Sequence, residues 1–374
     1  MIVQRLELVD YRNYAAATFE LTGGTTVVVG DNGQGKTNFA EALAYLATLS
    51  SFRGAPSDAL VRVGATSAVV RAELRDEDGR ASLIEAELVP AGRNRVQINR
   101  QRLHRARDLL GVVRVTVFSP DDLSLVKGGP IERRRFMDET LVGLAVKYDA
   151  ARLELERILR QRNTLLRQVG GRLDEAAATT LDVWDTRFAA AGDQFGYARA
   201  TLVARLRPHV LEAYERLAGR PTALELEYEP EWRQGGLAPA LAAARDQDVR
   251  RGVSTVGPHR DELALRIAGL AARTHASQGE QRTLALALRL AAHRLITERT
   301  GSTPVLVLDD VLSELDNARG TALLSHLPAG QVVITTAGVI PAAAAPERIV
   351  RIVAGTVSAG DDAATTAVAG ERAP

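Results

Sequence analysis

The 374-residue chain contains no cysteine. This absence excludes a disulfide framework and any metal site built on thiolates, and it is consistent with a reducing compartment. The histidines show no metal-ligand spacing either. They stand at His104, His209, His259, His275, His293 and His326.

Aromatic residues make up only 4% of the chain, so aliphatic side chains are expected to dominate its packing. No stretch approaches the roughly 20 uninterrupted apolar residues that a membrane-spanning helix needs. The first residues alternate like a strand and do not form a charged region followed by an apolar one, which argues against a signal peptide. We therefore expect a soluble, cytoplasmic protein without a membrane partner.

Neither sign of charge is in excess, since the formal net charge is +1. Lysine is rare: only Lys36, Lys127 and Lys147 occur, so 44 of the 47 basic residues are arginine. A GC-rich coding bias would produce the same enrichment. Bulk charge thus identifies no partner, although planar guanidinium groups suit phosphate.

The clearest motif is a glycine-rich loop ending in Lys-Thr. It follows the β-branched run 25–29, which predicts a buried strand, and it opens a helical pattern that continues through Leu49. Glycines allow successive N–H groups to surround a phosphate, and the helix N-terminus adds partial positive charge. The residues expected to bind nucleotide are Gly30, Asp31, Asn32, Gly33, Gln34, Gly35, Lys36 and Thr37. Lys36 is expected to reach the β- and γ-phosphates and Thr37 to bind Mg²⁺.

A second motif is an apolar strand, 305–308, that ends in two carboxylates. Ligands bind at the carboxyl ends of strands in open α/β sheets. We expect Asp309 to hold Mg²⁺ and Asp310 to polarise an attacking water. Because the glycine-rich loop and this strand lie far apart in the sequence, something large must be inserted within the nucleotide domain.

A third motif, 276–282, precedes a strong helical pattern over 279–299. Its serine and glycine resemble the signature motif of ABC ATPases, in which Ser277 and Gly279 would bind the γ-phosphate held by the opposite subunit. Ser277, Gln278 and Gly279 would then lie at the dimer interface. Ser277 is thereby also a candidate catalytic residue. The alternative is a simple capping box formed by Ser277 and Glu280.

Patterns of apolar and polar residues in the rest of the sequence suggest how the chain is organised. Short alternating runs over 61–100 predict an antiparallel meander, leucines and arginines over 131–217 predict long helices in a hairpin arm, and 332–336 predicts another strand. After Ala354 there is almost nothing to bury, so a disordered tail is expected.

Several longer blocks together resemble the RecF family, in order from residue 1 to about 353. They are Asp10-Tyr11-Arg12-Asn13-Tyr14, Pro120-Asp121-Asp122, 125–130, 133–138, 255–261 and 307–316. The resemblance implies an α/β fold: an ABC-type P-loop ATPase head with an inserted helical arm, similar to an SMC head without the long coiled coil. It assigns 1–125 and 253–353 to the head, 126–252 to the arm and 354–374 to the tail.

The same resemblance implies ATP-dependent homodimerisation, slow Mg²⁺-dependent ATP hydrolysis and DNA binding. It also implies a role with RecR, and with RecO, in loading recombinase at gapped DNA. Asp316 would lie in the D-loop at the dimer interface, and Thr335-Thr336 would replace the switch histidine of transporters. Asp310 stands where transporter ATPases have glutamate.

The most basic stretch is 93–107, and its DNA-binding candidates are Arg95, Arg100, Arg102 and Arg105. A solvated, arginine-rich strand pair is the alternative. For Arg133-Arg134-Arg135, DNA contact and a role at the ATPase interface stay open. No feature suggests base readout, so binding is expected to be independent of DNA sequence. Competing hypotheses are a transporter or other SMC-like ABC subunit, an SMC-like nuclease, and a scaffold that binds ATP without turnover.

Overall fold

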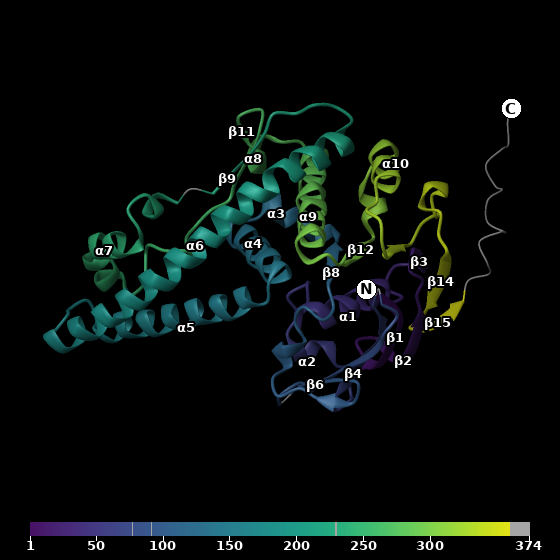
Figure 1. The fold of residues 1–374 in the computed structure, drawn as a ribbon, viewed down its shortest axis with the longest axis horizontal. Helices are drawn as coiled ribbons and strands as arrows, with labels where there is room; N and C mark the ends of the chain where they lie inside the picture. Colours follow the sequence, from purple (N-terminus) through teal and green to yellow (C-terminus); the bar gives the residue numbers. More distant parts are fainter. Residues whose placement is uncertain (77, 91, 229, 360–374) are drawn as a thin grey trace. The chain divides into compact units, whose positions relative to one another are not determined.

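The computed structural model describes residues 1–76, 78–90, 92–228 and 230–359, and Figure 1 traces its elements. The chain forms two compact units. The first contains Met1–Asp122, Arg216–Gly219 and the described residues from Arg289 onward, and the second contains the described residues of Leu123–Glu215 and Arg220–Leu288. The second unit thus extends beyond residue 252, which was the predicted end of the arm. The reason is that β9 (Leu224–Glu227) pairs with β10 (Ala264–Ile267).

The first unit contains a mainly parallel sheet in the order β15-β14-β3-β13-β12-β8. Its strands are β3 (Thr25–Val29), β8 (Val115–Phe118), β12 (Val305–Asp309), β13 (Val332–Thr336), β14 (Arg348–Val353) and β15 (Thr356–Ala359). Strands β12 and β13 are buried along their whole length, as continuous apolar runs predict for parallel strands. The expected strands at 25–29 and 332–336 are confirmed.

A second sheet in this unit is antiparallel, in the order β2-β1-β4-β5-β6-β7. Its strands are β1 (Ile2–Tyr11), β2 (Tyr14–Glu20), β4 (Ala68–Arg75), β5 (Ala81–Leu88), β6 (Arg95–Ile98) and β7 (Gln101–Arg102). The burial of β4 alternates, so one face packs inward and the other meets solvent. The predicted meander over 61–100 is therefore confirmed for 68–98.

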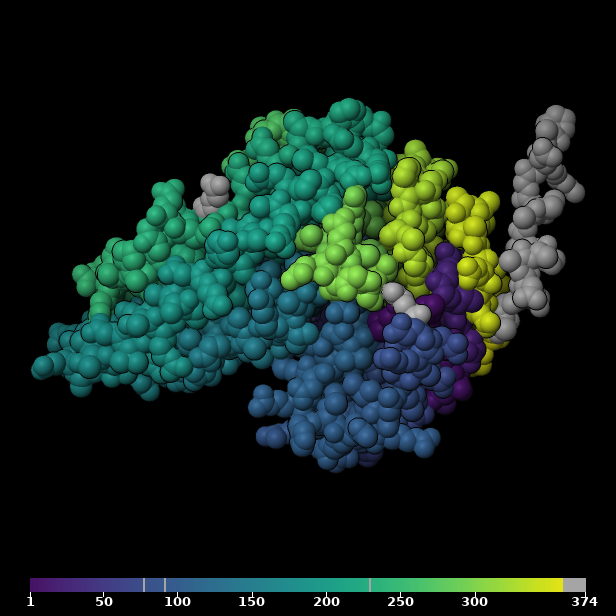
Figure 2. All heavy atoms as spheres, in the orientation of Figure 1, coloured from purple at the N-terminus to yellow at the C-terminus, as the bar shows by residue number. Residues whose placement is uncertain are grey.

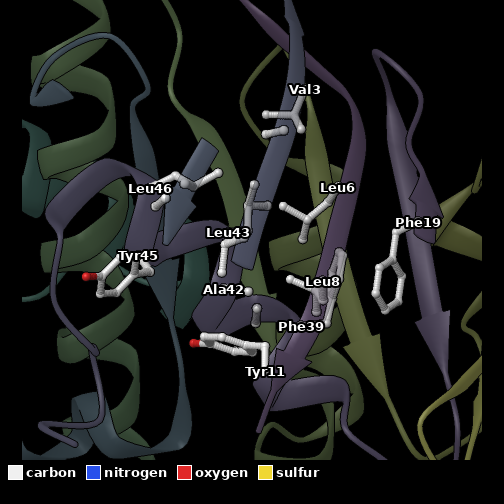
Figure 3. Close-up of a cluster of buried hydrophobic side chains, with 14 of the residues drawn as sticks. Val3, Leu6, Leu8, Tyr11, Phe19, Phe39, Ala42, Leu43, Tyr45 and Leu46 are labelled. Atoms are coloured by element: carbon white, nitrogen blue, oxygen red, sulfur yellow. The ribbon is translucent and has the colours of Figure 1, made fainter. Parts of the chain in front are cut away.

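Helix α1 (Lys36–Thr48) contributes to the main apolar core of this unit. Figure 3 shows Leu43 and Leu46 of α1 gathered with Leu6 and Leu8 of β1, and all four are fully buried. The ring of Phe39 lies 4.4 Å from that of Phe19, measured between centroids. The helix that starts at the glycine-rich loop is thus anchored on a packed apolar surface.

The second unit is largely helical. It contains α3 (Ser124–Lys127), α4 (Pro130–Leu144), α5 (Lys147–Gln168), most of α6 (Glu175–Ala218), α7 (Leu237–Arg251), α8 (Ala272–His275), the start of α9 (Gln278–Thr300), and the sheet β11-β10-β9 with β11 at Leu270–Ala271. The long helices predicted for 131–217 are confirmed, and they break at Gly170 and Gly171, where both residues have positive φ.

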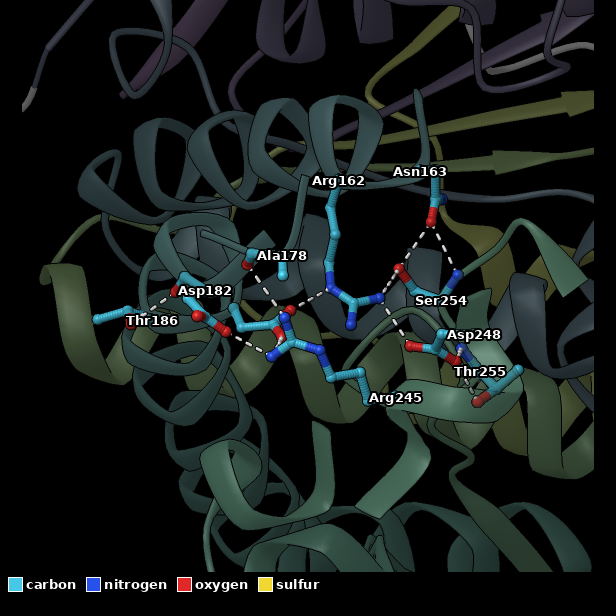
Figure 4. Close-up of polar contacts among 10 residues, drawn as sticks. Arg162, Asn163, Ala178, Asp182, Thr186, Arg245, Asp248, Ser254 and Thr255 are labelled. Atoms are coloured by element: carbon cyan, nitrogen blue, oxygen red, sulfur yellow. Dashed lines mark hydrogen bonds and ion pairs between the residues drawn. The ribbon is translucent and has the colours of Figure 1, made fainter. Parts of the chain in front are cut away.

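A buried ionic network joins the helices of this unit (Figure 4). The Arg162 side chain on α5 is fully buried and donates to Asp185 of α6 at 2.6 Å and to Asp248 of α7 at 2.7 Å. It also donates to Ser254 at 2.8 Å. Removing the arginine would leave the fully buried Asp248 carboxylate without its charge partner, which is strongly destabilising. The network therefore fixes α5, α6 and α7 against one another.

The prediction of a disordered tail from residue 354 is wrong for 356–359. Those residues form β15, which pairs antiparallel with β14 through the turn Ala354-Gly355. Ala354 and Gly355 both have positive φ, at 49° and 75°, and Val357 packs against the core. The apolar content of this segment is low, but one valine and a hairpin suffice to order it. The rest of the predicted tail, 360–374, lies outside the described residues.

No helix in the described ranges combines the length and the apolar character that a membrane crossing requires.

The pH dependence of stability should reflect His293 of α9. Its side chain is 1% exposed, and neither ring nitrogen has a hydrogen-bond partner among the described residues. Burial lowers the His293 pKa to about 4. Because the folded pKa lies below the usual value of about 6.5, the unfolded chain binds the proton more readily. We expect His293 alone to lower the free energy of unfolding by about 3 kcal/mol as the pH falls from about 6.5 through 4, with its full contribution to stability present above pH 6.5.

Urea unfolding of His293→Leu across this pH range should show a flatter dependence than the unsubstituted chain. His259, whose pKa burial also lowers to about 4, supplies the residual slope. Exposed His104→Gln is the control and should leave the slope unchanged. Equal slopes for His293→Leu and the unsubstituted chain would contradict the prediction.

Candidate nucleotide-binding site

The glycine-rich loop lies between β3 and α1, as its pattern predicts. Gly35 precedes the helix with φ of 123°, a conformation that side chains rarely adopt. Gly30 is required for space, because a Cβ there would lie 2.4 Å from the backbone oxygen of Ile352. Two glycines of the motif are therefore required by the local backbone conformation and packing, whether or not a ligand binds.

Lys36 is 6% exposed and folds back across the loop. Its Nζ donates to the backbone oxygens of Gly30 at 2.7 Å and Asp31 at 2.9 Å. An ammonium group held within the loop in this way is placed to donate to phosphate oxygens, which accept more strongly than neutral carbonyls.

Residues far apart in the sequence meet at the carboxyl ends of β3, β12 and β13. Thr37 Oγ1 donates to Asp309 Oδ1 at 3.3 Å, and Thr335 Oγ1 donates to the same oxygen at 2.6 Å. Asp309 is 2% exposed, and burial raises its pKa while the hydroxyls of Thr335 and Thr37 oppose that shift. The nearby charge of Asp310 raises the pKa further. The structure thus brings the two predicted metal-binding residues together.

Asp310 sits on a strained turn with φ of 52°. Its N–H donates to the backbone oxygen of Thr335 at 3.2 Å and to Thr335 Oγ1 at 3.0 Å. Its Oδ1 is buried and has no hydrogen-bond partner among the described residues. This carboxylate oxygen therefore has an unused hydrogen-bond acceptor position within the site.

Thr335 is a site residue whose role the sequence did not reveal. It is fully buried and bridges the Asp309 carboxylate to the Asp310 N–H. Thr336 has a different role, since its Oγ1 accepts from the Gly338 N–H at 3.1 Å. The position of the pair was noted in the sequence, but only the pairing of β12 with β13 shows which hydroxyl faces the carboxylates.

The donor set suits a hard cation bound together with phosphate. Asp309 and Thr37 offer oxygen ligands side by side, and Mg²⁺ commonly binds one or two protein oxygens, with phosphates and water completing its octahedron. No group of three histidine or acidic residues in the described ranges could hold a metal by itself. These residues therefore fit Mg²⁺ as a partner of a nucleotide.

Ser277 lies exposed at the start of α9 in the second unit. Its backbone N–H donates to Glu280 Oε2 at 2.9 Å, and its Oγ accepts from the Glu280 N–H at 3.3 Å, which together form a capping box. Gln278 is exposed and Gly279 half-buried. The predicted capping box is thus present, and Ser277 lies at the surface.

Asp316 caps α10 (Asn317–Ser325) in the first unit. It accepts from the Arg319 N–H at 2.9 Å and pairs with the Arg319 side chain at 2.8 Å. Its side chain is 55% exposed, so it is accessible while serving as a cap.

The basic stretch 93–107 forms a hairpin at the end of the antiparallel sheet, within the blue β4–β7 surface of Figure 2. Asn99 and Arg100 make its turn with positive φ, and Arg100, Arg102 and Arg105 are exposed. Arg95 differs, because it pairs with Glu87 at 3.2 Å. On the adjoining face of the sheet the charged side chains neutralise one another in ion pairs, and Gln97 donates a hydrogen bond to the last of them; the paired residues are Arg5, Glu7, Arg71 and Glu85.

The arginines at 133–134 are engaged inside the second unit. Arg133 is 5% exposed and forms a bidentate ion pair with the Glu262 carboxylate, with N–O distances of 2.6 and 2.7 Å. Arg134 is half-buried and donates to the backbone oxygen of Asp261 at 2.7 Å. Arg133 is therefore a structural residue and is unavailable to phosphate.

Comparison with known proteins decides the family. The family model described as "RecF/RecN/SMC N terminal domain" matches residues 2–354. The DNA replication and repair protein RecF of Streptomyces avermitilis is 45% identical over 356 residues, which cover 91% of this chain and 94% of that protein. The chain belongs to the RecF family. RecF of Acidothermus cellulolyticus is 43% identical and covers 90% of this chain and 94% of that protein.

Solved structures agree with the RecF assignment. A structure of the recombination mediator protein RecF with ATP in the RecFOR pathway superposes with a TM-score of 0.87 at 27% identity, covering 96% of this chain and 97% of that chain. An SMC head domain from Pyrococcus furiosus gives a TM-score of 0.55 at 16% identity, which shows a shared fold. The predicted fold class, an ABC-type α/β head with an inserted helical arm, is confirmed, and the transporter hypothesis is set aside.

Proposed function

We propose that this member of the RecF family is a slow, Mg²⁺-dependent ATPase that dimerises on ATP and binds DNA. In this proposal it acts with RecR and RecO to load recombinase at gapped DNA or single-strand/double-strand junctions. The observation that carries it is the convergence of Lys36, Thr37, Asp309 and Asp310 at one sheet edge. The resemblance to RecF bound to ATP supports the choice of nucleotide.

The proposed division of labour follows from the chemistry of each group. The loop N–H groups and the Lys36 ammonium hold the β- and γ-phosphates. Asp310 accepts a hydrogen bond from the attacking water and orients it toward the γ-phosphorus. Thr37 and Asp309 would hold Mg²⁺, which would neutralise charge on the phosphate oxygens when bound. Asp310 is shorter than glutamate and reaches less far, which fits slow turnover.

The second half of the proposed active site comes from another copy of the chain. Ser277, with Gln278 and Gly279 at the N-terminus of α9, offers a hydroxyl and partial positive charge to a γ-phosphate bound by that copy. The exposure of Ser277 and of the Asp316 side chain supports a place at the dimer interface. Light scattering of the full chain with and without ATP and Mg²⁺ tests the idea, and a persistent monomer would contradict it.

DNA binding is expected to depend on the hairpin arginines. Replacing Arg100, Arg102 and Arg105 with alanine should weaken binding to double-stranded DNA. Because each neutralised phosphate contributes about 0.9 to the slope of log affinity against log salt, the slope should flatten by up to about 3. Titrations at several salt concentrations measure this slope.

Arg95→Ala is the matched control, because its guanidinium is already paired with Glu87 on the same sheet. It should change the slope little. A slope in the triple variant equal to that of the unsubstituted chain would remove the hairpin from the DNA interface.

A further inference from the structure

The C-terminal hairpin lies beside the glycine-rich loop. Strand β14 pairs in parallel with β3, with Arg351 opposite Val29, so the turn that follows β14 reaches the level of the loop that follows β3. Ala354 and Gly355 form this turn with φ of 49° and 75°, as in a two-residue type I′ hairpin. The last described hairpin thus borders the candidate nucleotide site.

The turn donates two backbone hydrogen bonds to one residue of the loop. The N–H of Ala354 donates to the side-chain Oε1 of Gln34, and the N–H of Gly355 donates to its backbone oxygen at 3.3 Å. The side chain of Asn13 donates to the same backbone oxygen at 2.9 Å. Gln34 is therefore held from outside the loop by two segments distant in sequence.

The direction of these bonds bears on the phosphate site. A trans peptide is planar, so its carbonyl and the following N–H point to opposite sides. Holding the Gln34 oxygen outward therefore turns the Gly35 N–H toward the inner side of the loop. The next peptide is held in the same way, because Tyr14 donates to the Gly35 oxygen at 2.8 Å. Inward N–H groups are what a phosphate requires.

We propose that the Ala354-Gly355 turn and Asn13 are positioning residues that fix the peptide between Gln34 and Gly35 in its phosphate-binding orientation before nucleotide arrives. This inference rests on the proposed ATP binding. If the loop adopts its phosphate-binding conformation only part of the time, its apparent affinity for ATP falls in proportion to that fraction. Loss of the outer hydrogen bonds should therefore cost about tenfold in ATP affinity.

The chain supplies a matched pair of turns for the test. Gly355→Ala places a side chain at φ of +75°, with its Cβ 2.9 Å from the Asn13 backbone oxygen. Gly269→Ala imposes the same backbone strain on the equivalent Ala268-Gly269 turn between β10 and β11, where φ is 51° and 76° and the Cβ meets nothing within 4 Å. Ala354→Asn creates Asn-Gly, the preferred pair for this turn.

Two readouts on the full chain separate positioning from general stability. Binding of a fluorescent ATP analogue gives affinity, and hydrogen exchange without nucleotide reports on peptides covering 30–39. Gly355→Ala should weaken binding about tenfold and speed exchange over 30–39, whereas Gly269→Ala and Ala354→Asn should do neither. Gln34→Met, which removes the side-chain amide but keeps the backbone oxygen, should shift both readouts in the same direction as Gly355→Ala.

Unchanged exchange over 30–39 in Gly355→Ala, or equal affinity losses in Gly355→Ala and Gly269→Ala, would overturn the inference. If Gly355→Ala does not fold, Gln34→Met decides alone, and unchanged exchange in it overturns the inference. Retained ATP binding in Lys36→Ala would instead refute the proposed function. The two failures are therefore distinguishable.

Discussion

Replacing Lys36 with alanine should weaken ATP binding by at least about 100-fold, the loss expected when a charge-assisted contact to phosphate disappears from a buried site. The Lys36 ammonium is the only lysine nitrogen within the loop, and its side chain is 6% exposed. Truncation also removes the donor that satisfies the Gly30 and Asp31 backbone oxygens. Equilibrium dialysis with ATP and Mg²⁺ measures the affinity.

The scarcity of lysine provides a clean control for this experiment. Lys147→Ala removes an exposed lysine that lies over the Tyr148 ring, and it should leave ATP affinity unchanged. Circular dichroism of both variants checks folding. ATP affinity in Lys36→Ala equal to that of the control would refute the assignment of the loop as a phosphate site.

The substitution Asp310→Asn should slow hydrolysis by about 100-fold or more, the usual contribution of a group that accepts a proton from water. Asparagine keeps the shape of the side chain but loses the charge. The Asp310 N–H bonds to Thr335 involve the backbone, so the turn should persist. ATP binding is retained, and an ATP-bound dimer should accumulate because its breakdown is slow.

Phosphate release measures turnover in this variant, and light scattering with ATP and Mg²⁺ measures its mass. Asp121→Asn, at an exposed position, serves as the control with ordinary turnover. Unchanged turnover in Asp310→Asn would exclude Asp310 from the reaction. A slow variant that stays monomeric with ATP would retain its catalytic role and contradict the dimer.

The parts of this site that could be predicted are those encoded locally. The glycine-rich loop follows a β-branched strand and opens a helix, and Asp309-Asp310 end a continuous apolar run, so a short window of sequence specifies each one. Their meeting could be expected because parallel strands end at the same edge of a sheet. The capping of α9 by Ser277 and Glu280 was also readable, since it spans only four residues.

What could not be predicted depends on pairing across long stretches of chain. Thr335 faces Asp309 only because β13 lies next to β12, and the Ala354 turn reaches Gln34 only because β14 lies next to β3. For the triplet that contains Arg133 the sequence left DNA contact and a role at the ATPase interface open, because Glu262, which neutralises Arg133, lies far along the sequence. Composition suggested disorder after 354, because a hairpin held by backbone bonds has little apolar signal.

The strand order of the parallel sheet has a consequence for synthesis of the protein. Strand β3 is made early, yet both of its neighbours, β13 and β14, are among the last strands to leave the ribosome. At a synthesis rate of roughly 5–20 residues per second, both edges of β3 stay unpaired for a time on the order of tens of seconds. A nascent chain therefore carries its glycine-rich loop long before it can complete the nucleotide site. Unpaired strand edges invite wrong pairing, so this interval is when the chain most needs protection from aggregation.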